Sequence, residues 1–241
     1  MKKKEIEKKE IEFIGTELYR ETQERKKNGS WTQNDLQMEQ NLYKELNALG
    51  FNFSWHMQLS PKCFTKKDKA IVPIFMKYYG KFDRQGLNTM CIYCLSVRGL
   101  DKSVDFLLDQ IRKTDPTVGP EKRLLHNYLC NALYQIRDPK HADDYVTLIS
   151  NHNDLFPSTS LIVLLIGKLK IKKAIPYLVD ILNCESRADK TRGPDAVKPE
   201  CIEALGWYKD PSLSKYIEKY VTDEDVVIRQ EAQKALKRLK I

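Results

Sequence analysis

"DEDVVIRQEAQKALKRL", from Asp223 to Leu239, is the stretch that decides the fold of this 241-residue chain. Its apolar side chains recur with the period of an α-helix, so they form one stripe along a single helix. The stripe is poor in apolar area, and such a helix is not stable alone. Alanine lets a second helix come close, so the stretch predicts a stack of helices. The stripe consists of Ile228, Ala232, Ala235, Leu236 and Leu239.

Similar helical patterns run through most of the chain, and no stretch shows the alternation of a strand. The junctions "RGLDKS", "RDPKHA", "KLKIKKA" and "KDPSLS" follow helices at corresponding points. Proline suits such a junction because it is tolerated in the first helical turn and keeps the residue before it out of a helix. The predicted helices cover about 3–27, 33–49, 69–81, 83–97, 101–113, 121–136, 140–150, 158–169, 172–183, 197–208, 212–221 and 225–240.

Apolar residues of the helices before these junctions align, which reveals a repeat. Leu95, Leu133, Ile166, Leu205 and Leu236 are separated by 38, 33, 39 and 31 residues. Helix-turn-helix units of about thirty residues with inserted loops are typical of an α-solenoid. We therefore predict an all-α superhelix of about six repeats over 69–241, preceded by a helical pair and capping loop over 1–68, in one continuous domain.

Two segments resemble the HEAT-repeat family, in particular its short bacterial repeats. "KKAIPYLVDIL", from Lys172 to Leu182, is similar to the first helix of a repeat. "CIEALGWYKDPSLSKYI" from Cys201, followed by "DEDVVIRQEAQKAL" from Asp223, is similar to the second-helix pattern. The resemblance is clear over about 170–241, weaker over 100–169 and weakest before 69. It implies a superhelix that binds partners on its concave surface, and by itself it carries no catalytic residues.

Composition limits the class of protein. A net charge of +8, with 41% apolar and 31% charged residues, indicates a folded protein that could contact nucleic acid. The longest apolar run, Leu161 to Ile166, is too short for a membrane span, and no apolar core follows the first lysines, so a secretory signal is not expected. Cysteines at irregular spacing suit reduced thiols. We predict a cytoplasmic protein without a membrane partner.

The residues that face away from the predicted core define a candidate groove. They mix aromatic, amide and apolar side chains, which suits a protein or peptide partner. A track for a phosphate backbone would need Lys or Arg at most positions. Alternatively, Tyr93, Tyr134 and Trp207 fill gaps between repeats. The candidate partner-binding residues are Tyr93, Asn127, Asn131, Tyr134, Leu164, Lys168, Glu203, Trp207, Lys234 and Lys237, and the same transfer places Thr89, Gln135 and Gln230 beside them.

Two cysteine-containing segments raise the question of zinc. "CIYC", from Cys91 to Cys94, and "HNYLC", from His126 to Cys130, supply ligand types that form tetrahedral sites. Cys91 and Cys94 lie on the predicted core stripe, however, and Cys130 aligns with a flanking position. We therefore interpret these cysteines as small core residues and predict no metal or cofactor.

Two loops are longer than a repeat turn needs. In "FNFSWHMQLSPKCFTKK", from Phe51 to Lys67, Trp55 and His56 are candidate functional residues; alternatively, Phe51, Phe53, Trp55 and Phe64 cap the stack. The basic loop from Ser186 to Lys198 is interpreted as a solvated rim, with anion contact as the alternative. Acids at Asp143, Asp144 and 223–225 lie at helix starts and are interpreted as capping groups.

Two functional hypotheses follow. The first is a non-enzymatic scaffold that binds a protein or peptide in its groove, since no phosphate loop, nucleophile elbow or metalloprotease motif is present. The alternative is a DNA-binding or DNA-repair protein that resembles the HEAT-like alkylpurine DNA glycosylases, which are similarly long and basic. That resemblance implies that groove tryptophans and an aspartate handle the base. Here Trp207 lies in the predicted groove with Glu203 as the nearest acid, and the family's tryptophan-containing helix and aspartate have no residue-by-residue match. A bilin-lyase-like protein shares only the repeat wording.

Overall fold

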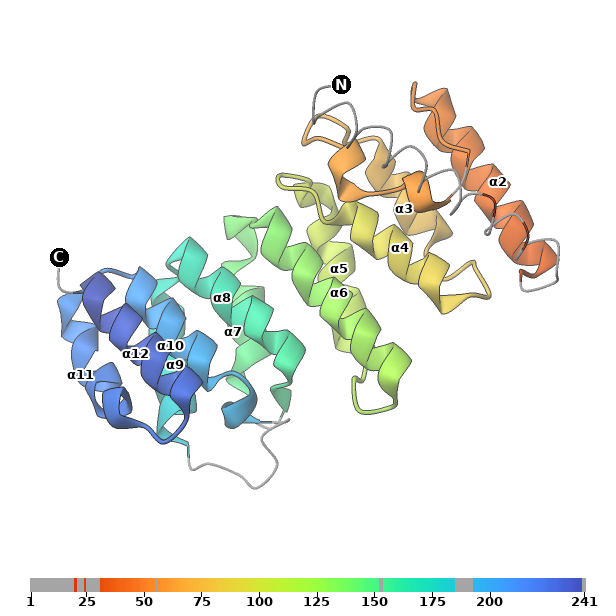
Figure 1. Cartoon of the computed structure of the whole chain (residues 1–241). Coiled ribbons are helices and arrows are strands. Elements are labelled where there is room, and N and C mark those ends of the chain that lie inside the picture. Colours follow the sequence, from red (N-terminus) through yellow and green to blue (C-terminus); the bar gives the residue numbers. More distant parts are fainter. Residues whose placement is uncertain are drawn as a thin grey trace, which may run out of the picture. The chain divides into compact units, whose positions relative to one another are not determined.

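The computed structural model describes residues 20, 24, 31–54, 56–151, 154–184 and 193–239, and the structural statements below concern these residues. They form α-helices and short 3-10 helices, without any β-strand (Figure 1). The all-α prediction is therefore confirmed. The helix predicted over 3–27 lies outside the described residues, apart from 20 and 24. The chain forms two compact units, Met1–Leu95 and Ser96–Ile241, and each is described by itself. The predicted division after residue 68 stays a prediction.

Over residues 31–95, the described part of the first unit contains three α-helices and an aromatic-rich loop. Thr32 begins the first of these helices, because its side chain accepts a hydrogen bond of 3.0 Å from the amide of Asp35. Phe64 of the loop packs between Phe53, at a ring-centroid distance of 5.8 Å, and Phe75, at 5.6 Å. Phe53 and Phe64 of the loop therefore belong to the core of this unit. The helices are α2 (Gln33–Ala48), α3 (Ile71–Tyr78) and α4 (Gln85–Leu95), with 3-10 helices η1 (His56–Gln58) and η2 (Pro61–Cys63) in the loop.

The second unit is a succession of helix pairs, at the positions that the apolar period predicts. The junctions are 3-10 helices, which the sequence did not distinguish from the helices that follow. Asp138 and Asp210 cap two of them, accepting hydrogen bonds from the amides of Lys140 (3.1 Å) and Ser212 (3.0 Å). The α-helices are α5 (Val104–Lys113), α6 (Pro120–Ile136), α7 (Ala142–Ser150), α8 (Ser160–Leu169), α9 (Ile175–Asn183), α10 (Lys198–Trp207), α11 (Ser214–Ile217) and α12 (Val226–Leu239).

The pairs stack in a repeat-like manner. The second helices α6, α8, α10 and α12, green to dark blue in Figure 1, each pack on the next, while the first helix α7 contacts α8 and α9. Leu133, Ile166 and Leu205, which the sequence places in register, are completely buried. Leu236, the last residue of the register in this unit, is half-buried.

Two glycines explain the alanines near the end of the chain. Gly167 on α8 and Gly206 on α10 each follow a register residue. A Cβ atom on Gly167 would lie 2.7 Å from Cα of Ala204, and one on Gly206 would lie 2.8 Å from Cα of Ala235. Real Cβ atoms do not come this close, so the helices approach each other through residues that have little or no side chain. The alanine stripe of α12 therefore packs against a glycine of α10.

Candidate functional site

The candidate site is the exposed side of α6, α8, α10 and α12, called the second-helix face below. In the second unit, none of the predicted partner-binding residues is buried. The role of these residues in binding stays a prediction. Tyr93 lies in the other unit, on α4, and is 37% exposed. The placement of Thr89 at the exposed surface is wrong: it is buried, and its hydroxyl donates to the carbonyl of Gln85 at 3.0 Å, so it needs no contact with water. The residues on the second-helix face are Asn127, Asn131, Tyr134, Leu164, Lys168, Glu203, Trp207, Lys234 and Lys237.

Trp207 is the centre of a cationic cluster on this face. The Nζ atom of Lys168 lies 3.6 Å from the centroid of its ring, and the guanidinium carbon of Arg238 lies 5.8 Å away. Both distances fall within the range of cation–π attraction. Arg238 also places Nη2 3.5 Å from Oε1 of Glu203. The cluster thus joins three neighbouring helices, α8, α10 and α12.

The sequence predicted Lys168, Glu203 and Trp207 but missed Arg238. The signal was present, because Lys168, Trp207 and Arg238 each lie two residues after a register residue, namely Ile166, Leu205 and Leu236. Side chains at equivalent positions of stacked helices lie in one row. The register therefore contains the information that brings Arg238 to Trp207.

Acidic side chains alternate with the basic ones on this face. Lys234 places Nζ 2.6 Å from Oε1 of Glu231. Burial raises the pKa of the Glu200 carboxyl, and the nearby charges of Glu203 and Glu231 raise it further. The second-helix face therefore carries a mixed charge pattern and not a continuous basic track.

Two adjacent cavities open where α6 extends beyond α8. α6 begins 13 residues before Leu133, whereas α8 begins six residues before Ile166, so the first turns of α6 have no counterpart on α8. One cavity, of about 470 Å³, is lined by His126 and Cys130 and is called the histidine cavity. The other, of about 870 Å³, is called the overhang cavity; its lining includes Arg123, Leu124, Asn127, Ser160 and Leu161.

A buried polar pair forms part of the wall between the two cavities. Nδ1 of His126 lies 2.7 Å from Oγ of Ser158, and Sγ of Cys130 lies 3.6 Å from the same nitrogen. Burial lowers the pKa of His126 to about 4 and raises the pKa of the Cys130 thiol. His126 lines the histidine cavity and Ser158 lines the overhang cavity. Because a nucleophile and its base must face one substrate, we assign this pair a structural role.

The four residues considered for zinc belong to different units of the chain. Cys91 and Cys94 are completely buried in the first unit, whereas His126 and Cys130 lie in the second. Cys130, predicted at a position that flanks the core stripe, is 1% exposed and packs beside His126. In the part of the chain that the structure describes, no group of three or more His, Cys, Asp or Glu residues could hold a metal ion.

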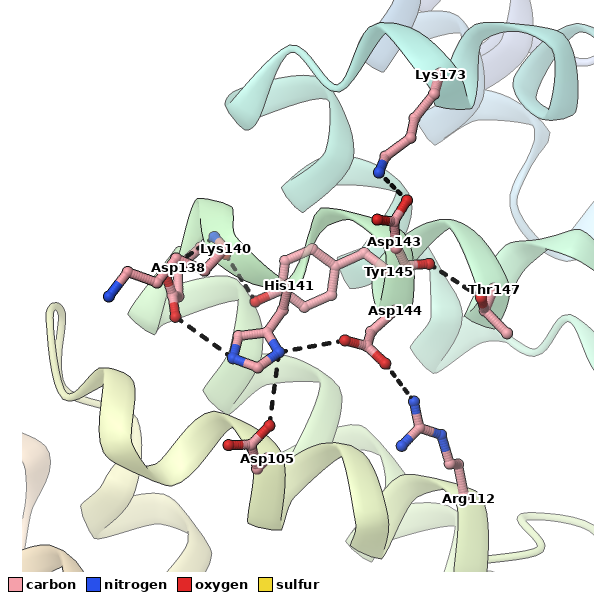
Figure 2. A network of polar contacts seen from close by, with 10 residues as sticks. All are labelled: Asp105, Arg112, Asp138, Lys140, His141, Asp143, Asp144, Tyr145, Thr147 and Lys173. Carbon is pink, nitrogen blue, oxygen red and sulfur yellow. Dashed lines mark hydrogen bonds and ion pairs between the residues drawn. The ribbon is translucent and has the colours of Figure 1, made fainter.

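A polar network connects α5 and α7, the first helices of two neighbouring pairs (Figure 2). His141 lies between three acids: its Nδ1 is 3.2 Å from Asp144 and 3.7 Å from Asp105, and its Nε2 is 3.6 Å from Asp138. Arg112 donates to Asp144 at 2.6 Å. Burial alone would raise the pKa of Asp144, but hydrogen bonds from Arg112 and His141 outweigh it and the pKa is lowered.

This network holds the first helices of neighbouring pairs together. It joins α5 to α7, and an ion pair between Lys173 and Asp143 extends it to the 3-10 helix η7 (Lys172–Ala174). From the sequence, "RDPKHA" was predicted only as a junction between helices, so the role of His141 in this network was not predicted. The prediction that the acids after His141 begin a helix is confirmed, because Asp143 and Asp144 lie in the first turn of α7.

The two loops differ in part from expectation. His56 places Nδ1 3.4 Å from Oε1 of Glu39, a partner that its spacing in sequence did not suggest. Trp55 lies outside the described residues, as do residues 186–192 of the basic loop. Lys198 at the end of that loop is not solvated: it is buried, with Nζ 2.9 Å from Asp195 and 3.0 Å from the carbonyl of Cys184. Within the described ranges, no helix is long and apolar enough to cross a membrane.

Comparisons with known proteins give limited likenesses. No family model matches the chain. A stretch of 74 residues is 34% identical to deoxyhypusine hydroxylase of Bos taurus, a HEAT-repeat enzyme; it is 31% of this chain and spans 22% of that protein. The crystal structure of an engineered protein superposes with a TM-score of 0.47 and 17% identity, over 72% of this chain and 81% of its own.

Proposed function

We propose that this chain is a non-enzymatic binding scaffold, an α-solenoid of about six HEAT-like repeats that presents its second helices to a protein or peptide. The repeat assignment is supported by the stacked helix pairs of the second unit, by the equivalent glycines Gly167 and Gly206, and by the short likeness to a HEAT-repeat enzyme.

The observation that carries the binding proposal is the Trp207 cluster. Trp207, which is half-buried, and Arg238 beside its ring are of the residue types that dominate the energy of protein interfaces, and Lys168 also lies beside the ring. Glu203 and Glu231 compensate neighbouring cations, so the face offers charges of both signs to a partner. Such alternation favours a specific protein surface, whereas a phosphate backbone would be repelled by the acids.

The test is capture of a partner by the immobilised chain and by two variants. Trp207→Ala removes the centre of the cluster, and Tyr177→Ala is the matched control, because Tyr177 is 37% exposed on the first helix α9. A partner identified with the unaltered chain should bind Tyr177→Ala equally and Trp207→Ala at least about tenfold more weakly, as expected for an interface hot spot.

A second variant separates loss of contact from loss of fold. Trp207 also lies over Gly167, so Trp207→Ala is expected to lower the melting temperature somewhat. Glu203→Lys reverses one charge of the cluster without removing buried apolar area. This variant should also weaken the binding of the same partner. Equal capture by the unaltered chain, Trp207→Ala and Glu203→Lys would show that the second-helix face is not the binding surface.

A further inference from the structure

The overhang cavity has the features of a binding site for part of a polypeptide partner, and the inference drawn from it rests on the proposed function. Its volume of about 870 Å³ is within the range of ligand pockets. Much of its lining is apolar: three prolines, Phe156, Leu124 and Leu161. Leu124 is 54% exposed. An exposed large apolar side chain at the mouth of a cavity is a feature of interaction sites.

Arg123 supplies the cavity with one uncompensated positive charge. It is the only charged residue among the described residues that line the cavity, and its side chain makes no hydrogen bond or ion pair with any of the described residues. The cations of the neighbouring histidine cavity differ in this respect. Arg112 is paired with Asp144 and Lys113 with Asp109, each at 2.6 Å. A ligand with a negative charge would therefore find its partner in Arg123.

Two further polar groups line the cavity without a side-chain partner among the described residues. Asn127 lies four residues after Arg123 on α6, on the same side of the helix, and Ser160 is the first residue of α8. An amide, a hydroxyl and a guanidinium thus accompany apolar walls. This combination fits a ligand that carries a hydrogen-bond acceptor next to an apolar group.

We infer that the overhang cavity binds an extended protein segment in which an acidic side chain lies next to apolar ones. The carboxylate pairs with the guanidinium of Arg123, whose planar donors match it. The apolar side chains pack on Leu124 and Leu161. A phosphorylated residue fits less well, because its phosphate carries close to two negative charges and Arg123 is the one cation among the described lining residues.

The acidic group belongs to the interior of the partner's chain and not to its carboxyl end. Asn131 follows Asn127 by one turn on α6, and Leu164 follows Leu161 by about one turn on α8. Asn131 and Leu164 were predicted as groove residues, and both side chains are partly exposed. A bound segment can therefore continue from the cavity along the second-helix face, which a chain terminus would not need.

The experiment uses the full chain and an array of acetylated, amidated nonapeptides. Each peptide has apolar residues on both sides of a central position that is acidic, amide or basic, and a further set ends in a free carboxylate after an apolar residue. Peptides that bind are then titrated by fluorescence anisotropy against the unaltered chain, Arg123→Glu and Lys122→Glu. Lys122 is the matched control, since it is an exposed cation on α6 that does not line the cavity.

We expect binding by the class with a central acid. Arg123→Glu should weaken it at least about tenfold, the loss expected for a charge-assisted hydrogen bond, and should allow the basic class to bind. Lys122→Glu should change the affinity less than about threefold, as expected for a surface charge. Both side chains are exposed, so thermal melts should show that the variants fold.

Other outcomes would overturn the inference. These are binding without preference for a central acid, preference for the free-carboxylate set, equal effects of the two variants, or no peptide binding. The proposed function is judged separately. A partner that is lost with Trp207→Ala but retained by Arg123→Glu would support the scaffold proposal and exclude the overhang cavity as its acidic-residue site.

Discussion

His126 couples the stability of the second unit to pH. The imidazole is 7% exposed, and burial lowers its pKa to about 4 from an ordinary value near 6.5. Between these values the unfolded chain binds a proton that the native chain does not, so the free energy of unfolding falls as the pH is lowered through this window. The expected loss between pH 7 and pH 4.5 is about 2 kcal/mol.

The measurement is urea unfolding at about pH 7 and pH 4.5 for the unaltered chain and for His126→Gln. Glutamine keeps a polar group near Ser158 but cannot take up a proton, so the variant should lose less stability on acidification than the unaltered chain. Protonation of the acidic residues destabilises both proteins to the same extent, so the difference between their pH dependences is due to His126. An identical pH dependence of the two proteins would contradict this prediction.

At the residue scale, the sequence predicted exposure better than contacts. The register placed Lys168, Glu203 and Trp207 on one surface, because position in a helix determines which way a side chain points. It did not reveal that Arg238 reaches both Trp207 and Glu203, since such contacts depend on rotamers and on helix spacing. The sequence did not reveal the pairing of His126 with Ser158 for the same reason, since the two residues are 32 positions apart in the chain.

At the scale of the helices, Gly167 and Gly206 set the distance between α8, α10 and α12. A methyl group on either glycine would meet the backbone of the next helix at 2.7–2.8 Å, which a side-chain rotation cannot relieve. Gly167→Ala and Gly206→Ala should therefore each lower the free energy of unfolding by about 1–3 kcal/mol, the usual effect of overpacking.

Gly86→Ala is the matched control for both variants. Gly86 lies in α4, and a Cβ atom there would have no neighbour within 4 Å. Alanine also has the higher helix propensity, so this variant should be as stable as the unaltered chain or up to about 1 kcal/mol more stable. Equal melting temperatures for the three variants would mean that the helices can separate without loss.

Most helix positions could be predicted from the sequence, because they follow the periodicity of the apolar residues. The prediction of a helix over 121–136 is close to the observed α6 (Pro120–Ile136), and the one over 158–169 is close to η6 (Pro157–Thr159) plus α8. The overhang of α6 beyond α8 was thus implicit in the predicted bounds. The cavity was not, because it depends on how the side chains of Pro116, Thr117 and Phe156 fill the space beside α6.

At the scale of the whole molecule, the net charge of +8 does not determine the partner. Charge acts on a nucleic acid through the cations that can reach phosphates, each of which releases counterions. On the second-helix face, Lys234 is paired with Glu231 and Arg238 with Glu203. The sequence could count the basic residues but could not show this pairing, which depends on adjacent turns and adjacent helices.

Duplex DNA should therefore bind weakly and with little dependence on salt. If the face offers about two free cations to the backbone, a plot of log K against log salt concentration should have a slope no steeper than about −2. The measurement is fluorescence anisotropy of a labelled duplex between about 50 and 200 mM salt.

A double variant, Glu203→Lys with Glu231→Lys, replaces two acids of the face by cations and frees their partners. It should bind the duplex more tightly with a steeper slope, which shows that the assay detects a basic track. Micromolar binding by the unaltered chain at the higher salt, with a slope near that of the double variant, would instead favour the DNA-binding alternative. In that case base excision would be the next activity to measure.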